Sequence, residues 1–306
     1  MQPFQLTLTN NGTVTGLHSI PPQLEPSPSQ RPLIIALHGG NYDSKYFDAT
    51  PNYSASNFSS FFKVPFVAID RPSYRGTSSI LPVPEGSNFH RETAIMLHRY
   101  IIPKLWTDFG QPNYCNCVVL LCHSLGVIGG VIVGALHAQE NAALYPLGGL
   151  IASGMGDKQS ASMKNNPVKV QLEGHMQFDL DAKDATMFKP GSVAAEILEQ
   201  TEALHVPAPL AETTTFPSVW LPVWKDEWAS QVKAPVMFSL VDDDPFFVSD
   251  KKELDGCVRA FKNSSRVDGS LVVGAPHCIE LSYWSRGWYA RCFGFALECA
   301  TGFGRV

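Results

Sequence analysis

The sequence predicts an α/β fold with a mostly parallel central sheet flanked by helices. Two observations lead to this prediction. Short apolar runs without polar alternation recur along the chain, which is typical of strands that are covered on both faces. Stretches of helical character lie between these runs, so right-handed crossovers are expected to join the strands. The predicted strands span residues 33–37, 64–69, 118–121, 150–152, 236–241 and 271–273.

The segments around these strands complete the predicted order of elements. Residues 7–20 contain a turn at Asn11 and Gly12, which is typical of a leading antiparallel hairpin. Helices are expected over three further ranges: 88–107, with Pro103 as a kink, 124–138 and 282–299.

Residues 156–232 break this alternation. They contain six prolines, polar stretches and short helical pieces, and no central strand is predicted among them. We therefore expect an inserted, mainly helical cap over 156–232. The core of the domain is then formed by residues 1–155 and 233–306.

The composition excludes several classes of protein. A chain of 306 residues with 44% hydrophobic and 17% charged residues is typical of a folded globular protein. A formal net charge of -5 gives no electrostatic reason to expect nucleic acid or an anionic membrane as a partner. No stretch is apolar enough to span a membrane, and the first residues lack a secretory signal. We therefore expect a cytoplasmic protein.

Cysteine and histidine spacing argues against a metal site. The seven cysteines are an odd number, and three of them lie in or beside the strand at 118–121, which favours reduced, buried thiols over a disulfide framework. The nine histidines show no metal-binding pair, and no phosphate-binding glycine loop is present. No cofactor is expected.

A serine follows one of the predicted strands and precedes a predicted helix. Ser124 comes directly after the apolar run at 118–121, and Gly126 lies two residues further on. A sharp strand-to-helix turn that exposes a nucleophilic serine needs small neighbours, and Gly126 meets that need. Cys122 stands where a glycine is usual in such a turn. The alternative interpretation is an ordinary turn with an exposed serine.

Three further groups follow predicted strands and support the first interpretation. His38, Gly39 and Gly40 follow strand 33–37, and glycines there let backbone N–H groups approach a developing oxyanion. The carboxylates Asp242, Asp243 and Asp244 follow strand 236–241, and His277 follows strand 271–273. Open α/β sheets place their binding crevice at this edge, where the carboxyl ends of the strands meet.

With these motifs the chain resembles the α/β-hydrolase superfamily. The matching stretches are LHGG at 37–40, DRPSYRG at 70–76, CHSLG at 122–126, DDDP at 242–245 and APH at 275–277. In the second stretch Ser73 stands where the family has a glycine. Within the superfamily the chain is most similar in style to small capped esterases and peptidase-like enzymes, and to hydrolases of fungal natural-product pathways, that is, of secondary metabolism.

The resemblance implies a role for each motif. Ser124 would be the nucleophile, His277 the general base and then acid, and an aspartate would orient the imidazole. Asp244 is the expected aspartate, because its family counterpart commonly precedes a proline or apolar residue, and Asp242 is the alternate. The backbone N–H groups of Leu125 and Gly40 would form the oxyanion hole, with Asn41 as a neighbouring candidate.

Other polar residues near these motifs have competing interpretations. His38 and His123 are expected to be structural, and Cys278 is expected to be a buried packing residue. Glu280 is either a supporting partner of the site or an exposed charge. Arg75 is expected to pair with Asp70 and fix its loop, and the alternative is that Arg75 binds substrate.

The predicted cap suggests the kind of substrate. Trp220, Trp224 and Trp228 recur every four residues, and they either pack the cap on the core or form an aromatic wall for a substrate. Methionine and phenylalanine are also frequent in the cap, so an apolar pocket is expected. Such a pocket suits a small uncharged ester, lactone or polyketide-like molecule.

Three functions are therefore open on the sequence. The first is a serine hydrolase that cleaves an ester, thioester or lactone through an acyl-enzyme at Ser124. The second is acyl transfer, cyclisation or carbon–carbon cleavage on the same fold. The third is a ligand-binding protein without catalysis, and neither the substrate nor the oligomeric state follows from the sequence.

Overall fold

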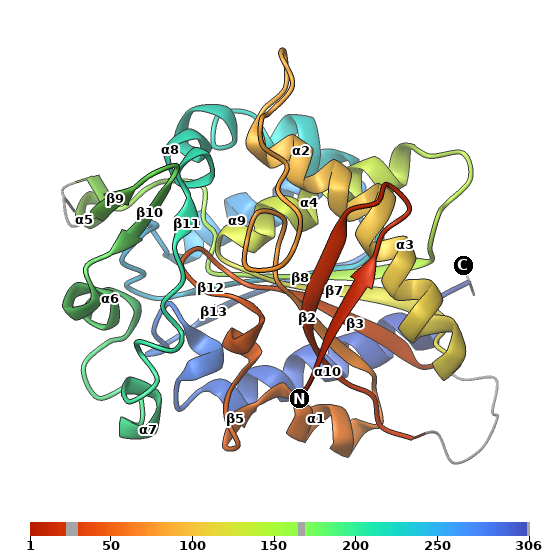
Figure 1. The fold of residues 1–306 in the computed structure, drawn as a ribbon, viewed down its shortest axis with the longest axis horizontal. Helices are drawn as coiled ribbons and strands as arrows, with labels where there is room; N and C mark the ends of the chain where they lie inside the picture. Colours follow the sequence, from red (N-terminus) through yellow and green to blue (C-terminus); the bar gives the residue numbers. More distant parts are fainter. Residues whose placement is uncertain (23–29, 165–168, 305–306) are drawn as a thin grey trace.

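The computed structural model describes residues 1–22, 30–164 and 169–304. An eight-stranded sheet crosses the molecule, and helices cover both of its faces (Figure 1). From β6 to β13 all neighbouring strands are parallel, whereas β1 pairs with β2 and β2 with β6 in antiparallel fashion. The predicted fold class is thus confirmed. In spatial order the strands are β1 (Gln2–Thr7), β2 (Thr13–Ser19), β6 (Phe66–Ile69), β3 (Pro32–Leu37), β7 (Cys117–His123), β8 (Leu147–Ser153), β12 (Val236–Val241) and β13 (Val267–Val272).

The continuous apolarity of the central strands follows from burial on both faces. In β3, Leu33, Ile35 and Leu37 belong to one hydrophobic core, while Ile34 and Ala36 belong to the other. Successive strand side chains point to opposite faces, so each face needs its own apolar set. The helices α2 (Phe89–Met96), α4 (Leu125–Gln139) and α9 (Lys251–Ala260) supply the first core, and α1 (Ala55–Phe62) and α10 (Ser285–Gly302) supply the second.

The helix expected over 88–107 has an irregular middle. Helix α2 continues into a π-helical segment, Leu97–Ile101, which is followed by α3 (Ile102–Leu105) and a second π-helical segment, Trp106–Gly110. Pro103 has no N–H to donate and its ring crowds the preceding turn. The wider π-turn before it relieves this crowding, so the helical path continues past the proline.

The elements α5 to α8 of the insertion between β8 and β12 lie along the left side of Figure 1, with α8 at the upper left and α7 at the lower left. The insertion includes a three-stranded antiparallel sheet, ordered β11-β10-β9, that the sequence did not lead us to expect. Its strands are only two to four residues long, too short to show a periodic pattern. The elements are α5 (Ala161–Lys164), β9 (Lys169–Leu172), β10 (His175–Phe178), α6 (Leu180–Met187), α7 (Ala195–Leu198), β11 (Ala208–Pro209) and α8 (Leu210–Val219).

The tryptophans of the insertion pack on the core. The rings of Trp220 and Trp224 stack with centroids 5.8 Å apart, and Trp224 also stacks on Phe238 of β12. The indole N–H of Trp224 donates to Asp157 Oδ1 at 2.8 Å, so the buried indole nitrogen has a hydrogen-bond acceptor. Trp228 is partly buried against the same core. The packing interpretation of this row therefore agrees with the structure.

All seven cysteines are buried free thiols. Burial in apolar surroundings raises the pKa of Cys278 to about 12, so this thiol stays protonated. Over residues 1–22, 30–164 and 169–304, no helix is both long enough and apolar enough to cross a bilayer.

Candidate active site

A strained turn places Ser124 between β7 and α4. Ser124 has φ 51° and ψ -126°, a conformation that a residue with a side chain rarely adopts. Gly126 is required two residues later, because a Cβ there would lie 2.5 Å from the carbonyl oxygen of Leu37. Because α4 lies so close to the end of β3, no side chain fits at position 126. The sharp turn at Ser124 leads directly into α4 and exposes the serine.

Cys122, in the place usually occupied by a glycine, fits because of a glycine on the facing helix. A Cβ at Gly130 would lie only 2.4 Å from the Cys122 sulfur. Gly130 on α4 therefore provides the space that the Cys122 thiol occupies. The small residue that this close packing requires is therefore Gly130 on α4, and position 122 on β7 can hold a cysteine.

The structure brings Ser124, His277 and Asp244 together at the carboxyl ends of the strands. Nε2 of His277 lies 3.1 Å from Ser124 Oγ, and Nδ1 lies 2.8 Å from Asp244 Oδ2. The other carboxylate oxygen of Asp244 accepts the backbone N–H groups of Phe246 and Phe247 at 2.8 and 3.2 Å. His277 and Asp244 are buried, so the hydrogen bond between them is shielded from water, whereas Ser124 is half-buried.

The two other aspartates have different surroundings. Asp242 Oδ1 accepts hydrogen bonds from Lys189 Nζ at 2.7 Å and from the backbone N–H of Gly274 at 2.8 Å. These contacts hold the turn after β13 and lower the Asp242 pKa despite its partial burial. Asp243 occupies the tip of the turn, with φ 46°. Of the three carboxylates, Asp244 is the one that contacts the imidazole.

The two expected oxyanion-hole residues lie next to each other beside Ser124. A Cβ at Gly40 would lie 2.8 Å from a methyl group of Leu125. Leu125 is the first residue of α4, so its N–H has no acceptor within the helix. Asn41, the neighbouring candidate, directs its side-chain amide to the carbonyl oxygens of Met176 and Val206 in the insertion, at 3.0 and 3.1 Å.

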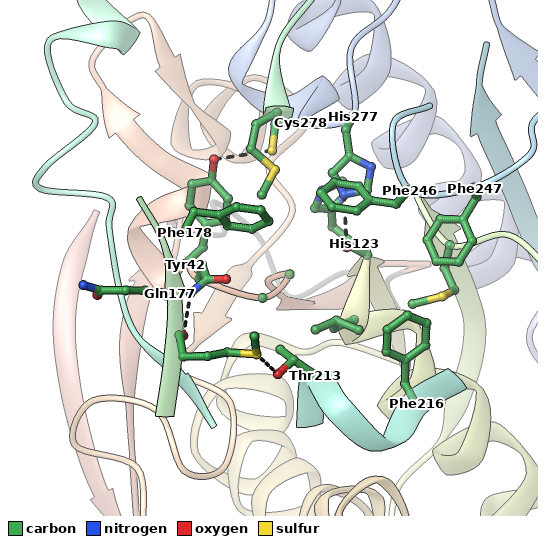
Figure 2. Close-up of a pocket in the computed structure, with 18 residues that line it drawn as sticks. Tyr42, His123, Gln177, Phe178, Thr213, Phe216, Phe246, Phe247, His277 and Cys278 are labelled. Atoms are coloured by element: carbon green, nitrogen blue, oxygen red, sulfur yellow. Dashed lines mark hydrogen bonds between the residues drawn. The ribbon is translucent and has the colours of Figure 1, made fainter. Parts of the chain in front are cut away.

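These groups open into one apolar pocket of about 650 Å³, including its mouth. Figure 2 shows the rings of Tyr42 and Phe178 on one side of the pocket and those of Phe216, Phe246 and Phe247 on the other. Met155, Met176 and Met187 also line it. No lysine, arginine, aspartate or glutamate is among the described lining residues. Within the described chain, no three His, Cys, Asp or Glu side chains are grouped to hold a metal.

The rings beside His277 are aromatic and uncharged. The edge of Phe246 lies against His277 with centroids 4.5 Å apart, and His123 lies at 5.0 Å. Burial, followed by electrostatic interactions with the His277 and His38 rings, lowers the His123 pKa well below its usual value. His123 is therefore neutral, and it stacks on Tyr46 in the manner expected of a structural histidine.

Glu280 contacts Tyr46, the residue on whose ring His123 stacks. Its carboxylate is buried and accepts hydrogen bonds from the hydroxyl of Tyr46 at 2.6 Å and the indole N–H of Trp288 at 2.8 Å. The structure therefore excludes the exposed-charge interpretation of Glu280. Through Tyr46, Glu280 fixes the ring on which His123 stacks.

The expected ion pair between Arg75 and Asp70 is not formed. Arg75 Nε donates to Asp43 Oδ2 at 2.7 Å. Asp70 instead accepts the hydroxyl of Thr15 at 2.6 Å and the backbone N–H of Ser44 at 2.9 Å. The chain turns between positions 70 and 75 through left-handed residues, with φ 70° at Ser73, where the family has glycine, and 49° at Arg75.

The sequence analysis did not single out Arg71, whose guanidinium contacts the loop that carries Gly40. Arg71 is buried and contacts the carbonyl oxygen of Gly39 and the carboxylate of Glu212. Its only sequence signal was its place in the DRPSYRG stretch. Its partner Glu212 is 141 residues away, so the pair could not be inferred from spacing.

Comparisons with solved structures establish the fold. An N-acyl homoserine lactonase structure with N-hexanoyl homoserine aligns over 97% of both chains at TM-score 0.62 and 15% identity. A monoglyceride lipase from Saccharomyces cerevisiae aligns over 98% of this chain and 95% of its own at TM-score 0.64 and 14% identity. The thioesterase domain of the curacin biosynthetic pathway aligns over 97% and 99% at TM-score 0.57 and 13% identity.

The chain has the α/β-hydrolase fold. No protein-family model and no curated protein sequence matches it. At 13–15% identity these structural alignments establish the α/β-hydrolase fold and leave the reaction to be argued from the site. The narrower likeness to fungal-pathway hydrolases stays a prediction.

Proposed function

We propose that the protein is a serine hydrolase that cleaves an uncharged ester, thioester or lactone through an acyl-enzyme at Ser124. The observation that carries this proposal is the continuous set of contacts from Ser124 Oγ through His277 to Asp244. Asp244 holds the imidazole with Nδ1 protonated, which leaves Nε2 free to accept the serine proton. Its own contacts with two backbone N–H groups keep the carboxylate fixed.

Each step of the reaction has a group in place. Ser124 Oγ attacks the substrate carbonyl carbon while its proton passes to His277 Nε2. The N–H groups of Gly40 and Leu125 stabilise the negative oxygen that forms. His277 then returns the proton to the leaving alcohol or thiol. In the second half, water gives a proton to His277 and attacks the acyl carbon; the acid is then released as His277 returns that proton to Ser124 Oγ.

The pocket supports a small apolar acyl substrate. With phenylalanine and methionine side chains and no fixed charge in its wall, it desolvates an alkyl, aromatic or polyketide-like group without leaving a charge unpaired. The structural neighbours named as a lactonase, a lipase and a thioesterase agree with such a substrate.

Ser124→Ala tests the assignment. The wild-type protein is expected to hydrolyse p-nitrophenyl butyrate and to be labelled by a fluorophosphonate, and the variant is expected to lose both properties. Ser218→Ala, at an exposed position of α8, is the matched control and should keep them. Undiminished labelling of the Ser124→Ala protein would refute the proposal.

Isotope labelling separates hydrolysis from the alternatives on the same fold. In water enriched in heavy oxygen, a hydrolase places one solvent oxygen in the product acid, because water is the second nucleophile. Turnover without solvent oxygen in the product would instead indicate acyl transfer, cyclisation or carbon–carbon cleavage without net hydrolysis.

A further inference from the structure

A buried arginine connects the insertion to the loop that carries Gly40. Arg71 follows β6, and its guanidinium forms an ion pair with Glu212 on α8, with both side chains 2% exposed. The hydroxyl of Tyr74 also donates to Glu212 and lies 3.2 Å from Arg71 NH2. Besides its contacts with Glu212 and Tyr74, the Arg71 guanidinium donates to a backbone carbonyl of the active-site loop, whereas its Nε–H has no hydrogen-bond partner among the described residues.

The carbonyl oxygen of Gly39 accepts two hydrogen bonds. Arg71 NH2 donates to it at 3.2 Å, and His38 Nδ1 lies 2.7 Å from it. His38 Nε2 accepts the backbone N–H of Arg71 at 3.1 Å, so the proton of His38 is on Nδ1, which donates to Gly39. Neither Arg71 nor His38 lines the pocket, whereas Gly39 and Gly40 do. The Gly39 carbonyl therefore points out of the pocket toward these donors.

The direction of this carbonyl fixes the direction of the next N–H. In a trans peptide the C=O and the following N–H point in opposite directions. When the Gly39 oxygen is held outward, the Gly40 N–H is directed into the pocket beside Ser124. A cationic donor on the oxygen also polarises the peptide, which makes the N–H a stronger donor.

We propose that Arg71 is a positioning residue that holds the Gly39–Gly40 peptide in its oxyanion-binding orientation, and that Glu212 of the insertion keeps Arg71 in place. This inference rests on the proposed hydrolase function. Arg71 does not touch the substrate, and its effect passes through the Gly40 N–H. Because Glu212 lies on α8, the oxyanion hole is complete only when α8 is docked as in this structure.

The test removes both charges together. Arg71→Met alone would leave Glu212 buried without a partner, whereas Arg71→Met/Glu212→Met leaves no lone charge. For p-nitrophenyl butyrate we expect a 10- to 100-fold lower kcat/KM with KM within about twofold, less than the 10²- to 10³-fold loss on removing a whole donor. Arg75→Met, which removes an arginine of the same loop that pairs with Asp43, is the control and should keep wild-type values.

A transition-state analogue distinguishes positioning from general damage. The ketone 1,1,1-trifluoro-2-pentanone adds to a serine hydroxyl and places a negative oxygen in the oxyanion hole. Its inhibition constant should rise in the double variant by the same factor as kcat/KM falls. An unchanged inhibition constant, an unchanged kcat/KM, or a loss confined to KM would each overturn the proposal.

Two further comparisons separate failure of this inference from misfolding of the double variant and from failure of the proposed function. If the double variant does not fold, as judged by its melting temperature, Arg71→Lys is judged by the same criteria. Lysine retains the charge but lacks the planar fork that reaches Glu212 and Gly39 together, so a matched fall in kcat/KM and rise in the inhibition constant are again expected. If wild-type and Ser124→Ala proteins are equally inactive, the proposed function fails; if only Ser124→Ala is inactive and the Arg71 variants are not, this inference alone fails.

Discussion

Lys183 is a lysine whose ammonium group is removed from water. It lies on α6 and is completely buried. Its Nζ donates to the carbonyl oxygens of Asn41 and Leu204 at 3.2 and 2.8 Å and lies 3.9 Å from the centre of the Tyr42 ring. Loss of hydration lowers the pKa of Lys183 from 10.5 to about 8, although Cys278, Asp184 and Asp43 oppose the change.

This lowered pKa predicts how the folding free energy changes with pH. Below pH 8 the amine is protonated in both the folded and the unfolded chain, so the full cost of burying the charge is present. Between pH 8 and 10.5 the unfolded chain binds more protons, so the contribution of this site to stability rises with pH. A pKa of about 8 in place of 10.5 corresponds to about 3 kcal/mol in total, of which about 1.4 kcal/mol is gained by pH 9.

Lys183→Met isolates this contribution, because methionine fills similar space without a titrating group. Urea unfolding of both proteins at pH 7 and pH 9 gives the difference in their free energies of unfolding. This difference should move in favour of the wild type by about 1.4 kcal/mol between the two pH values. Lys252→Met, at an exposed position, is the control. A difference that is the same at pH 7 and pH 9, or that moves the other way, would refute the reasoning.

The remaining predictions concern the site. Asp244→Asn should lower kcat about 10⁴-fold by disturbing the imidazole, whereas Asp242→Asn should change it less than tenfold; equal losses in steady-state assays would contradict the assignment of Asp244. Gly130→Ala should lower the free energy of unfolding in urea by about 1–3 kcal/mol through the clash with Cys122, and Cys122→Gly should restore it; additive effects in the double variant would exclude this contact. Met187→Ala should raise the ratio of kcat/KM for p-nitrophenyl hexanoate to that for the butyrate, because it enlarges the pocket, and an unchanged ratio would place the acyl group elsewhere.

The fold could be predicted because its signals are local. The strand at Val236–Val241 has the predicted bounds, and the strand predicted at 118–121 extends to Cys117–His123. A strand buried on both faces must be apolar at every position, and that pattern is visible without knowing its neighbours. The short strands of the insertion, such as His175–Phe178, have no comparable pattern, because their register depends on pairing with distant segments.

The contacts of individual charged residues were harder to predict. Arg75 was expected to pair with Asp70, but it pairs with Asp43. Either carboxylate satisfies an arginine chemically, and the choice depends on turns that involve left-handed backbone conformations. Glu280 was left open between a supporting partner of the site and an exposed charge, because a single glutamate in a short segment shows no periodicity.

The sequence by itself determined the order of the parallel strands of the central sheet and the positions of Ser124, Asp244 and His277 just after their strands, because burial and turn chemistry act over a few residues. Only the tertiary structure decided that Asp244 contacts the imidazole, that Gly130 makes room for Cys122, and that Arg71 joins Glu212 to the Gly39 carbonyl. Apart from the Gly130–Cys122 pair, these partners lie more than thirty residues apart along the chain. Their distances are set by how the helices and the insertion pack on the sheet, and no local pattern records that packing.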